Sequence, residues 1–92
     1  MNLRKHPEAE SLLRAAYEKS PRARAVVAQL SRICAINGKL DEAIELGRKS
    51  ITLFPIPARP QRLTILATLY DMAGREEEAL AARAEAARLA QA

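Results

Sequence analysis

Few residues of this chain have types and spacings that could support catalysis or metal binding. The single histidine, His6, stands beside a proline, where a capping or solvent-exposed role is expected. The single cysteine, Cys34, falls on an apolar helical stripe, and a reactive thiol would instead need an exposed, basic environment. The three consecutive glutamates at 76–78 point in different directions around a helix. The three glycines are isolated, so they form no phosphate-binding loop. We therefore predict no catalytic, cofactor or metal site and no enzymatic activity.

Four arginines stand where the helix dipole does not favour them. Acidic residues are favoured at helix N-termini and basic residues at C-termini, each by about 0.3–1 kcal/mol. Arg22 and Arg24 lie at the start of the second predicted helix, and Arg59 and Arg62 lie at the start of the fourth. A local cost without a local gain suggests a function. The hypothesis is a basic edge that docks an acidic partner, and the alternative is a set of ordinary solvated arginines. The net charge of +4 agrees mildly with the first.

The elements that must position these residues are all helical. Apolar residues recur at a spacing of three or four, and no segment alternates like a strand. Ser20-Pro21 resembles a capped helix start, and Gly38 and Gly74 suit the left-handed position just past a helix end. The sequence predicts an all-α fold with five helices at 7–19, 20–37, 40–54, 59–73 and 76–90.

The stretch 27–44 predicts how neighbouring helices pack. An apolar stripe on one helix is followed by the turn Asn37-Gly38, and a second stripe begins at once at Leu40. A turn this short makes the two helices antiparallel, with their apolar faces together. Pro55 ends the second helix, and the prolines at 57 and 60 prevent it from resuming. Three small residues should let the backbones approach closely, namely Ala43, Gly47 and Ser50.

The helix-turn-helix pattern repeats along the chain. Pro21 and Pro55 are 34 residues apart, as are Ala9 and Ala43, while Gly38 and Gly74 are 36 apart. This period resembles the tetratricopeptide repeat (TPR). At the places of the family pattern, the first full copy carries Val27, Leu30, Ser31, Cys34, Ala43, Gly47 and Pro55, and the second carries Leu63, Leu66, Ala67, Tyr70, Ala79 and Arg83. The departures are aliphatic residues for the first aromatic, Gly47 and Arg83 for the phenylalanine, and a longer link at 55–60.

The resemblance covers nearly the whole chain and implies a short right-handed solenoid. The expected organisation is a single domain, 1–92, with a half repeat at 7–20 and repeats at 21–55 and 56–91. In this family the first helix of each unit lines a concave groove that takes an extended or helical peptide. By resemblance, the groove residues are Ala25, Ala28, Gln29, Arg32, Ile36, Gln61, Thr64, Ile65, Thr68 and Met72. The clamp for a terminal carboxylate found in some members is not predicted, because only Arg32 is present and the asparagine is missing.

The expected function is protein–protein interaction through this groove, as an adaptor or a small assembly chaperone, without a cofactor. One alternative is a nucleic-acid binder that uses the basic edge, against which stand eleven acidic residues and only three aromatic ones. Another is a structural piece of a longer solenoid. Outward-facing apolar residues on the first helix would allow self-association through Leu12, Leu13 and Tyr17, unless these residues pack inward.

Composition sets further bounds. The chain is 49% hydrophobic but only 3% aromatic, so the core must be built from Leu, Ile, Val and Ala. Fewer than three repeats should give marginal stability, within or below about 5–15 kcal/mol. There is no apolar run near the ~18 residues of a membrane span, and the start lacks the apolar region of a signal peptide. With one cysteine and no membrane segment, we expect a cytoplasmic protein.

Overall fold

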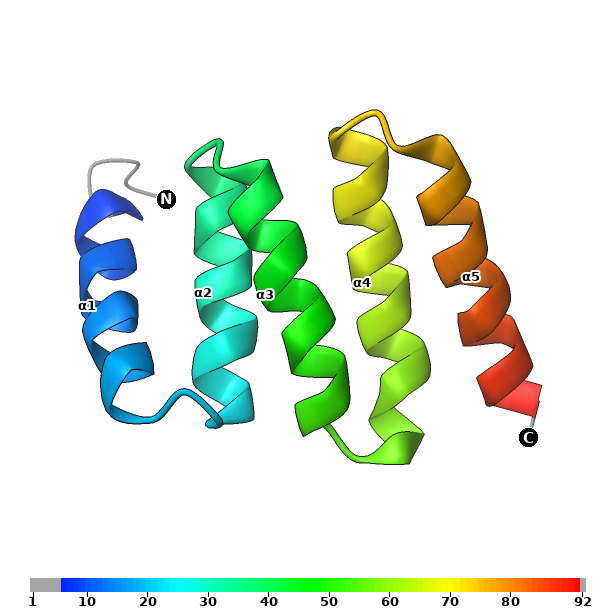
Figure 1. Cartoon of the computed structure of the whole chain (residues 1–92), viewed down its shortest axis with the longest axis horizontal. Helices are drawn as coiled ribbons and strands as arrows, with labels where there is room; N and C mark the ends of the chain where they lie inside the picture. The colour runs from blue at the N-terminus through cyan, green and yellow to red at the C-terminus, as the bar shows by residue number, and fades with distance from the viewer. Residues whose placement is uncertain (1–5, 92) are drawn as a thin grey trace.

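The computed structural model describes residues 6–91, and within that range the fold is all-α with five α-helices, as predicted. The helices lie in a row and run antiparallel to their neighbours, so that each packs chiefly on the next (Figure 1). A single turn of 3₁₀ helix, η2, precedes the fourth helix. Their bounds are α1 His6–Lys19, α2 Arg24–Ile36, α3 Leu40–Leu53, η2 Ile56–Ala58, α4 Arg59–Met72 and α5 Glu76–Gln91.

The row of helices has two distinct edges (Figure 1). The turns 37–39 and 73–75 lie at one edge, which we call the turn edge. The connections 20–23 and 54–58 lie at the other, which we call the junction edge. The helix pairs α2–α3 and α4–α5 are therefore two hairpins, joined to each other and to α1 at the junction edge.

The two hairpin turns share one hydrogen-bond pattern. Gly38 and Gly74 have φ of 82° and 75°, a conformation that costs glycine little because it has no Cβ. The amide of Lys39 donates to the carbonyl of Cys34, and the amide of Arg75 donates to that of Tyr70, each over 2.8 Å. This is the Schellman motif that closes a helix C-terminus. The predicted role of both glycines is confirmed.

The core runs along the row, within both hairpins and between them, from α2 to α5. Its fully buried side chains include Val27, Leu30 and Cys34, and burial raises the pKa of the Cys34 thiol. A Cβ added to Gly47 would meet side-chain atoms of α4 at 3.4 Å, which shows how closely α3 approaches α4. In the α2–α3 pair, the hydroxyl of Ser31 donates to the carbonyl of Ala43 over 2.7 Å. The predicted close approach of small residues and the buried cysteine are confirmed.

The predicted start of the second helix is wrong by four residues. Residues 20–23 form a turn, in which the amide of Ala23 donates to the carbonyl of Ser20 over 3.0 Å. Ser20 therefore belongs to the turn and does not cap α2. As predicted, α3 ends before Pro55 and does not resume, and the prolines at 57 and 60 stand near the starts of the next two elements. They occupy the first turns of η2 and α4, where a missing N–H costs nothing.

A charged cluster joins α1 to the first hairpin. The carboxylate of Glu10, on a residue only 6% exposed, accepts hydrogen bonds from Lys39 Nζ at 2.6 Å, Arg14 Nε at 2.8 Å and Asn37 Nδ2 at 2.8 Å. These three hydrogen bonds, that from Lys39 first, lower the pKa of Glu10 from 4.5 to about 2. Arg14 also pairs with Glu42 of α3 at 2.6 Å. We call these five residues the Glu10 cluster.

The outer face of α1 has fewer apolar side chains than self-association through Leu12, Leu13 and Tyr17 would require. Leu13 and Tyr17 pack against the core, and only Leu12 is exposed, at 73%. The three residues therefore do not form one outward patch, because they fall on different sides of the helix. Of the two roles expected for His6, capping or solvent exposure, the second is wrong, because the residue is buried and its Nε2 has no hydrogen-bond partner among residues 6–91.

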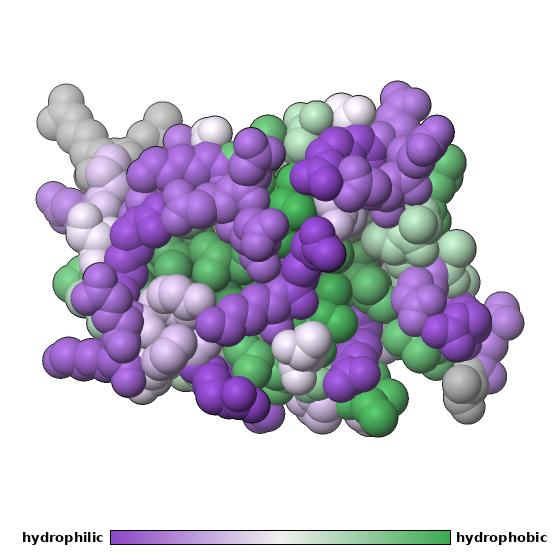
Figure 2. Space-filling model, in the orientation of Figure 1, coloured by the Kyte–Doolittle hydropathy of each residue, from purple (hydrophilic) through white to green (hydrophobic). Residues whose placement is uncertain are grey.

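The surface is mixed in polarity. Figure 2 shows hydrophilic side chains over much of one face, with hydrophobic residues visible in the furrows between them. None of the helices in residues 6–91 has the length and apolar character needed to cross a membrane.

Candidate functional site

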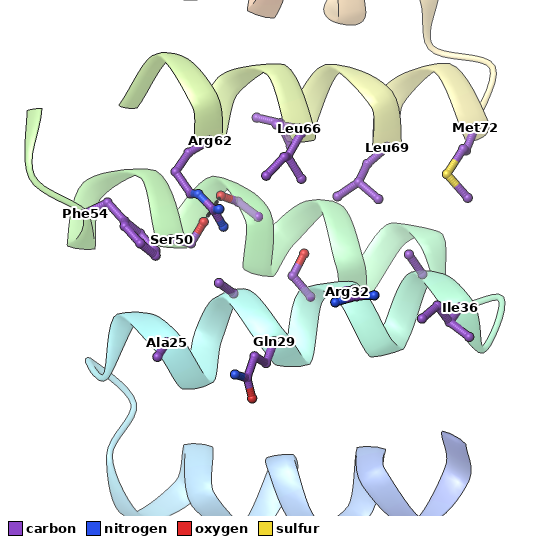
Figure 3. A pocket seen from close by; sticks show the side chains of 15 residues that line it. Ala25, Gln29, Arg32, Ile36, Ser50, Phe54, Arg62, Leu66, Leu69 and Met72 are labelled. Atoms are coloured by element: carbon purple, nitrogen blue, oxygen red, sulfur yellow. Dashed lines mark hydrogen bonds between the residues drawn. The ribbon is translucent and has the colours of Figure 1, made fainter. Parts of the chain in front are cut away.

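A groove of about 790 Å³ runs between α2 and α4, with α3 as its floor (Figure 3). The floor is low because Gly47 has no side chain and Ser50 a short one, whose hydroxyl is bonded to the carbonyl of Gly47 at 2.7 Å. The walls come from one face each of α2 and α4. The groove is lined by Ala25, Ala28, Gln29, Ser31, Arg32, Ala35, Ile36, Gly47, Ser50, Phe54, Arg62, Ile65, Leu66, Leu69 and Met72.

The two ends of the groove differ in chemistry. Ile36 and Met72 at the turn edge and Ile65 in the middle of α4 are 43%, 55% and 43% exposed, which is unusual for large apolar side chains in a small domain. At the junction edge, Phe54 and Arg62 lie next to each other (Figure 3). The groove is therefore aromatic and basic at the junction end and mainly apolar at the turn end, where Arg32 lies one helical turn before Ile36 (Figure 3).

No residue that lines the groove is acidic. Arg32 and Arg62 line it, and neither forms an ion pair with any carboxylate of residues 6–91. The cations that do form ion pairs lie outside the groove, and they are Arg14, Lys39, Arg75, Arg83 and Arg88. The groove thus carries positive charge that the described chain does not neutralise.

The structure brings most of the predicted groove residues together and separates three. All five from α2 line the groove, as do Ile65 and Met72 of α4. Gln61 and Thr64 instead line a shallow hollow on the far side of α4, with Arg83 and small residues of α5, and Thr68 lines neither. Gln61, Thr64 and Thr68 follow Ala25, Ala28 and Arg32 by 36 positions. Like those α2 residues, they face the next helices along the row and not the preceding ones.

Sequence reasoning missed the residues that the groove takes from α3 and from the inner face of α4. Phe54 is the chief omission, since it stands just past the end of α3 and was not among the predicted groove residues. Arg62 was assigned to the basic edge and not to the groove. Its position three residues before Ile65 and ten before Met72, on one helical face, was a usable signal.

The basic-edge arginines have different environments. The guanidinium carbons of Arg24 and Arg62 lie 5.8 and 4.7 Å from the centre of the Phe54 ring. Arg59 is half-buried, with an Nε that finds no hydrogen-bond partner within residues 6–91. Arg22 is exposed in the connection before α2. The predicted edge therefore divides into a pair on Phe54 and two separate residues.

Other candidate chemistry is sparse in the described chain. Across residues 6–91, His, Cys, Asp and Glu side chains form no group of three that could hold a metal ion. A weak contact of 3.8 Å joins Arg14 to the Cys34 sulfur, inside the core.

No protein-family model matches the sequence, and no curated protein matches it significantly.

Proposed function

We propose that this chain is a TPR-like module that binds a segment of another protein in the groove between α2 and α4, as an adaptor or a small assembly chaperone. The observation that carries the proposal is the exposure of Ile36, Ile65 and Met72 inside one concave groove. Removing apolar surface from water is worth about 25 cal/mol per Å², so an occupant that covers them is stabilised. The module works by binding and has no catalytic role in this proposal.

The register of the helices supports the TPR-like part of the proposal. α1 and α3 each have 14 residues, and their first residues, His6 and Leu40, are 34 positions apart. The two glycine turns are 36 positions apart and share their hydrogen bonds. A helix-turn-helix unit of this length, stacked on copies of itself, is the TPR arrangement.

The test is selection of peptides from a random phage-displayed library on the folded protein. The groove variant Ile65→Glu/Arg32→Glu serves for comparison, because both residues are exposed and their replacement should leave the fold intact. The matched control is Leu12→Glu/Arg48→Glu, which makes the same chemical changes at exposed sites outside the groove. Circular dichroism confirms folding of each.

Peptides that bind the wild type and the control but not the groove variant would support the proposal. Selection of no binding peptide, or of peptides that bind all three proteins equally, would overturn it.

A second candidate function is nucleic-acid binding at the junction edge. The observation in its favour is that Arg22, Arg24 and Arg48 are exposed and form no ion pair within residues 6–91. Base stacking is less supported, because the ring of Phe54 already has guanidinium groups against it. Affinity for an oligonucleotide that falls steeply with salt and lacks sequence preference would favour this candidate.

A third candidate is a structural part of a longer solenoid. The hollow on the far side of α4 is lined by residues that repeat groove residues 36 positions earlier: Gln61 follows Ala25, Thr64 follows Ala28, and Ala86 follows Ser50. The outer face of the second hairpin thus repeats the surface on which α4 packs. A further hairpin fused after residue 91 should raise the denaturation midpoint if this face accepts one.

A further inference from the structure

The strongest unexplained feature lies at the junction end of the groove, where Arg62 and Phe54 line it and Arg24, outside the lining, lies against the Phe54 ring. Both guanidinium carbons lie within 6 Å of the ring centre, close enough for attraction to its π-face. Contact with the ring restricts each guanidinium group. The N–H bonds lie in the plane of the guanidinium group and point outward from its edge. Stacking on the ring therefore leaves them able to donate to a planar anion such as a carboxylate.

Within the described residues, Arg24 and Arg62 lack the counter-charge that three arginines of the second hairpin have. Arg75, Arg83 and Arg88 each pair with a carboxylate of the second hairpin. Arg24 and Arg62 have no such partner within residues 6–91, and the first turns of α2 and α4, beside them, contain no acidic residue. Both helix N-termini add positive partial charge at this end of the groove. The site therefore favours an anion supplied from outside.

The spacing of the two groove ends limits the occupant. Arg62 and Met72 are ten residues apart on α4, which corresponds to about 15 Å along a helix. An extended chain advances about 3.3 Å per residue and covers this distance in four or five residues. A helix advances only about 1.5 Å per residue and needs about ten residues to cover the same distance, so an extended segment is the shorter occupant that reaches both ends.

We infer that Arg24 and Arg62, held on Phe54, form a carboxylate subsite, and that the groove takes an extended polypeptide segment with an acidic residue there. A large apolar side chain four or five residues away then contacts Ile36 and Met72 at the other end of the groove. The inference rests on the proposed function and specifies the chemistry of its partner.

The experiment uses synthetic peptides with capped ends, built on glycine and serine. Each has a pair of glutamates and a pair of leucines, separated by spacers from about one to about eight residues, in both chain directions. A matched series has glutamine for glutamate. Binding is followed by NMR, with the backbone amides of the groove and the side-chain Nε–Hε signals of Arg24 and Arg62 as readouts.

We expect the best affinity at a spacing of four or five residues, with shifts of both arginine Nε–Hε signals that the glutamine series does not produce. The variant Arg24→Gln/Arg62→Gln should bind the glutamate peptide about tenfold more weakly and bind the glutamine peptide as the wild type does. The control Arg22→Gln/Arg48→Gln removes the same charge from the same edge and should change affinity less than about twofold.

Arg24→Gln alone tests the same point if the double variant unfolds, because Arg24 is exposed. Equal affinity for the glutamate and glutamine series, or no dependence on spacing, would overturn the inference while leaving a binding groove in place. Absence of binding by every peptide of the series would also overturn it. In that case, recovery of groove-dependent peptides from the random library would show that the proposed function survives.

Discussion

The contact between α1 and the first hairpin differs in kind from the contact between α3 and the second hairpin, and we call these two contacts the first and second junctions. α1 packs on α2 and α3 packs on α4, and the two outer helices are 14 residues long with a 34-residue offset. Glu10 and Ile44 occupy the same place in this repeat, and both are buried, at 6% and 1% exposure. The first junction is closed by a carboxylate with three hydrogen-bond donors, and the second by an apolar side chain in the core.

The difference depends on the turn that each outer helix meets. A buried carboxylate is costly unless it is fully hydrogen-bonded. The first hairpin turn supplies Asn37 and Lys39 as donors. The equivalent positions of the second turn hold Ala73, whose side chain has no donor, and Arg75, which pairs with Glu78 in its own helix. A hydrogen-bonded carboxylate can therefore be buried only at the first junction. The packing of α1 there depends on the protonation state of Glu10.

The largest expected effect is at the apolar junction. Ile44→Ala should destabilise the protein by about 2–5 kcal/mol, because it removes buried carbon atoms and leaves a cavity. Urea denaturation followed by circular dichroism measures this loss. Leu12→Ala, at an exposed site on α1, is the control and should change stability by less than about 0.5 kcal/mol. A loss below about 1 kcal/mol for Ile44→Ala would contradict the assignment of this junction to the core.

The ionic junction should lose less. Glu10→Gln keeps the size of the side chain but removes the charge that accepts three hydrogen bonds, so we expect a loss of about 1.5–3 kcal/mol in the same assay. Glu8→Gln removes a charge from an exposed site in the first turn of α1 and should cost less than about 0.5 kcal/mol. Equal losses of stability for Glu8→Gln and Glu10→Gln would show that the Glu10 cluster contributes no more than an exposed surface charge.

Acid should separate the two junctions. Because the folded protein holds the pKa of Glu10 at about 2, below the unfolded value of 4.5, the stabilisation is fully present above pH 4.5. It is lost as the pH falls from 4.5 towards 2. Denaturation midpoints across this window should fall less steeply for Glu10→Gln than for the wild type, while Ile44→Ala should keep the wild-type slope. Parallel slopes for all three proteins would contradict the assignment.

The smallest effects compare the cations of the two turns. Lys39→Gln should cost about 1 kcal/mol, because it removes the shortest hydrogen bond to a buried carboxylate. Arg75→Gln, 36 positions later, removes a pair between exposed side chains and should cost less than about 0.5 kcal/mol. Thermal denaturation at low salt measures both. The reverse order would place the stronger ionic contact in the second hairpin.

Local signals in the sequence were enough to predict the helices. Apolar spacing and the two glycines predicted the number of helices and the hairpin turns, because these depend on residues a few positions apart. The start of α2 was missed because Ser20-Pro21 suits both a helix cap and a tight turn, and the choice depends on how α1 meets α2. The Glu10 cluster was missed because its members are up to 32 positions apart and meet only after the hairpin forms.

The groove was predictable on one helix and only partly on the other. The five residues on α2 were implied by the resemblance to the repeat family, and they lie on the side that its buried stripe leaves open. On α4 both sides have neighbouring hollows, so periodicity alone could not separate Ile65 and Met72 from Gln61 and Thr64. Phe54 enters the groove from outside a helix, and no periodic rule describes such a position.

Packing of each helix chiefly on its neighbours also determines how this molecule folds and opens. Contacts between residues close in sequence require only short loop closures, which is typical of domains that fold within microseconds to milliseconds. The chain is quasi-one-dimensional, so an end helix can detach while the remainder keeps its structure. Release of α1 would leave the groove between α2 and α4 intact.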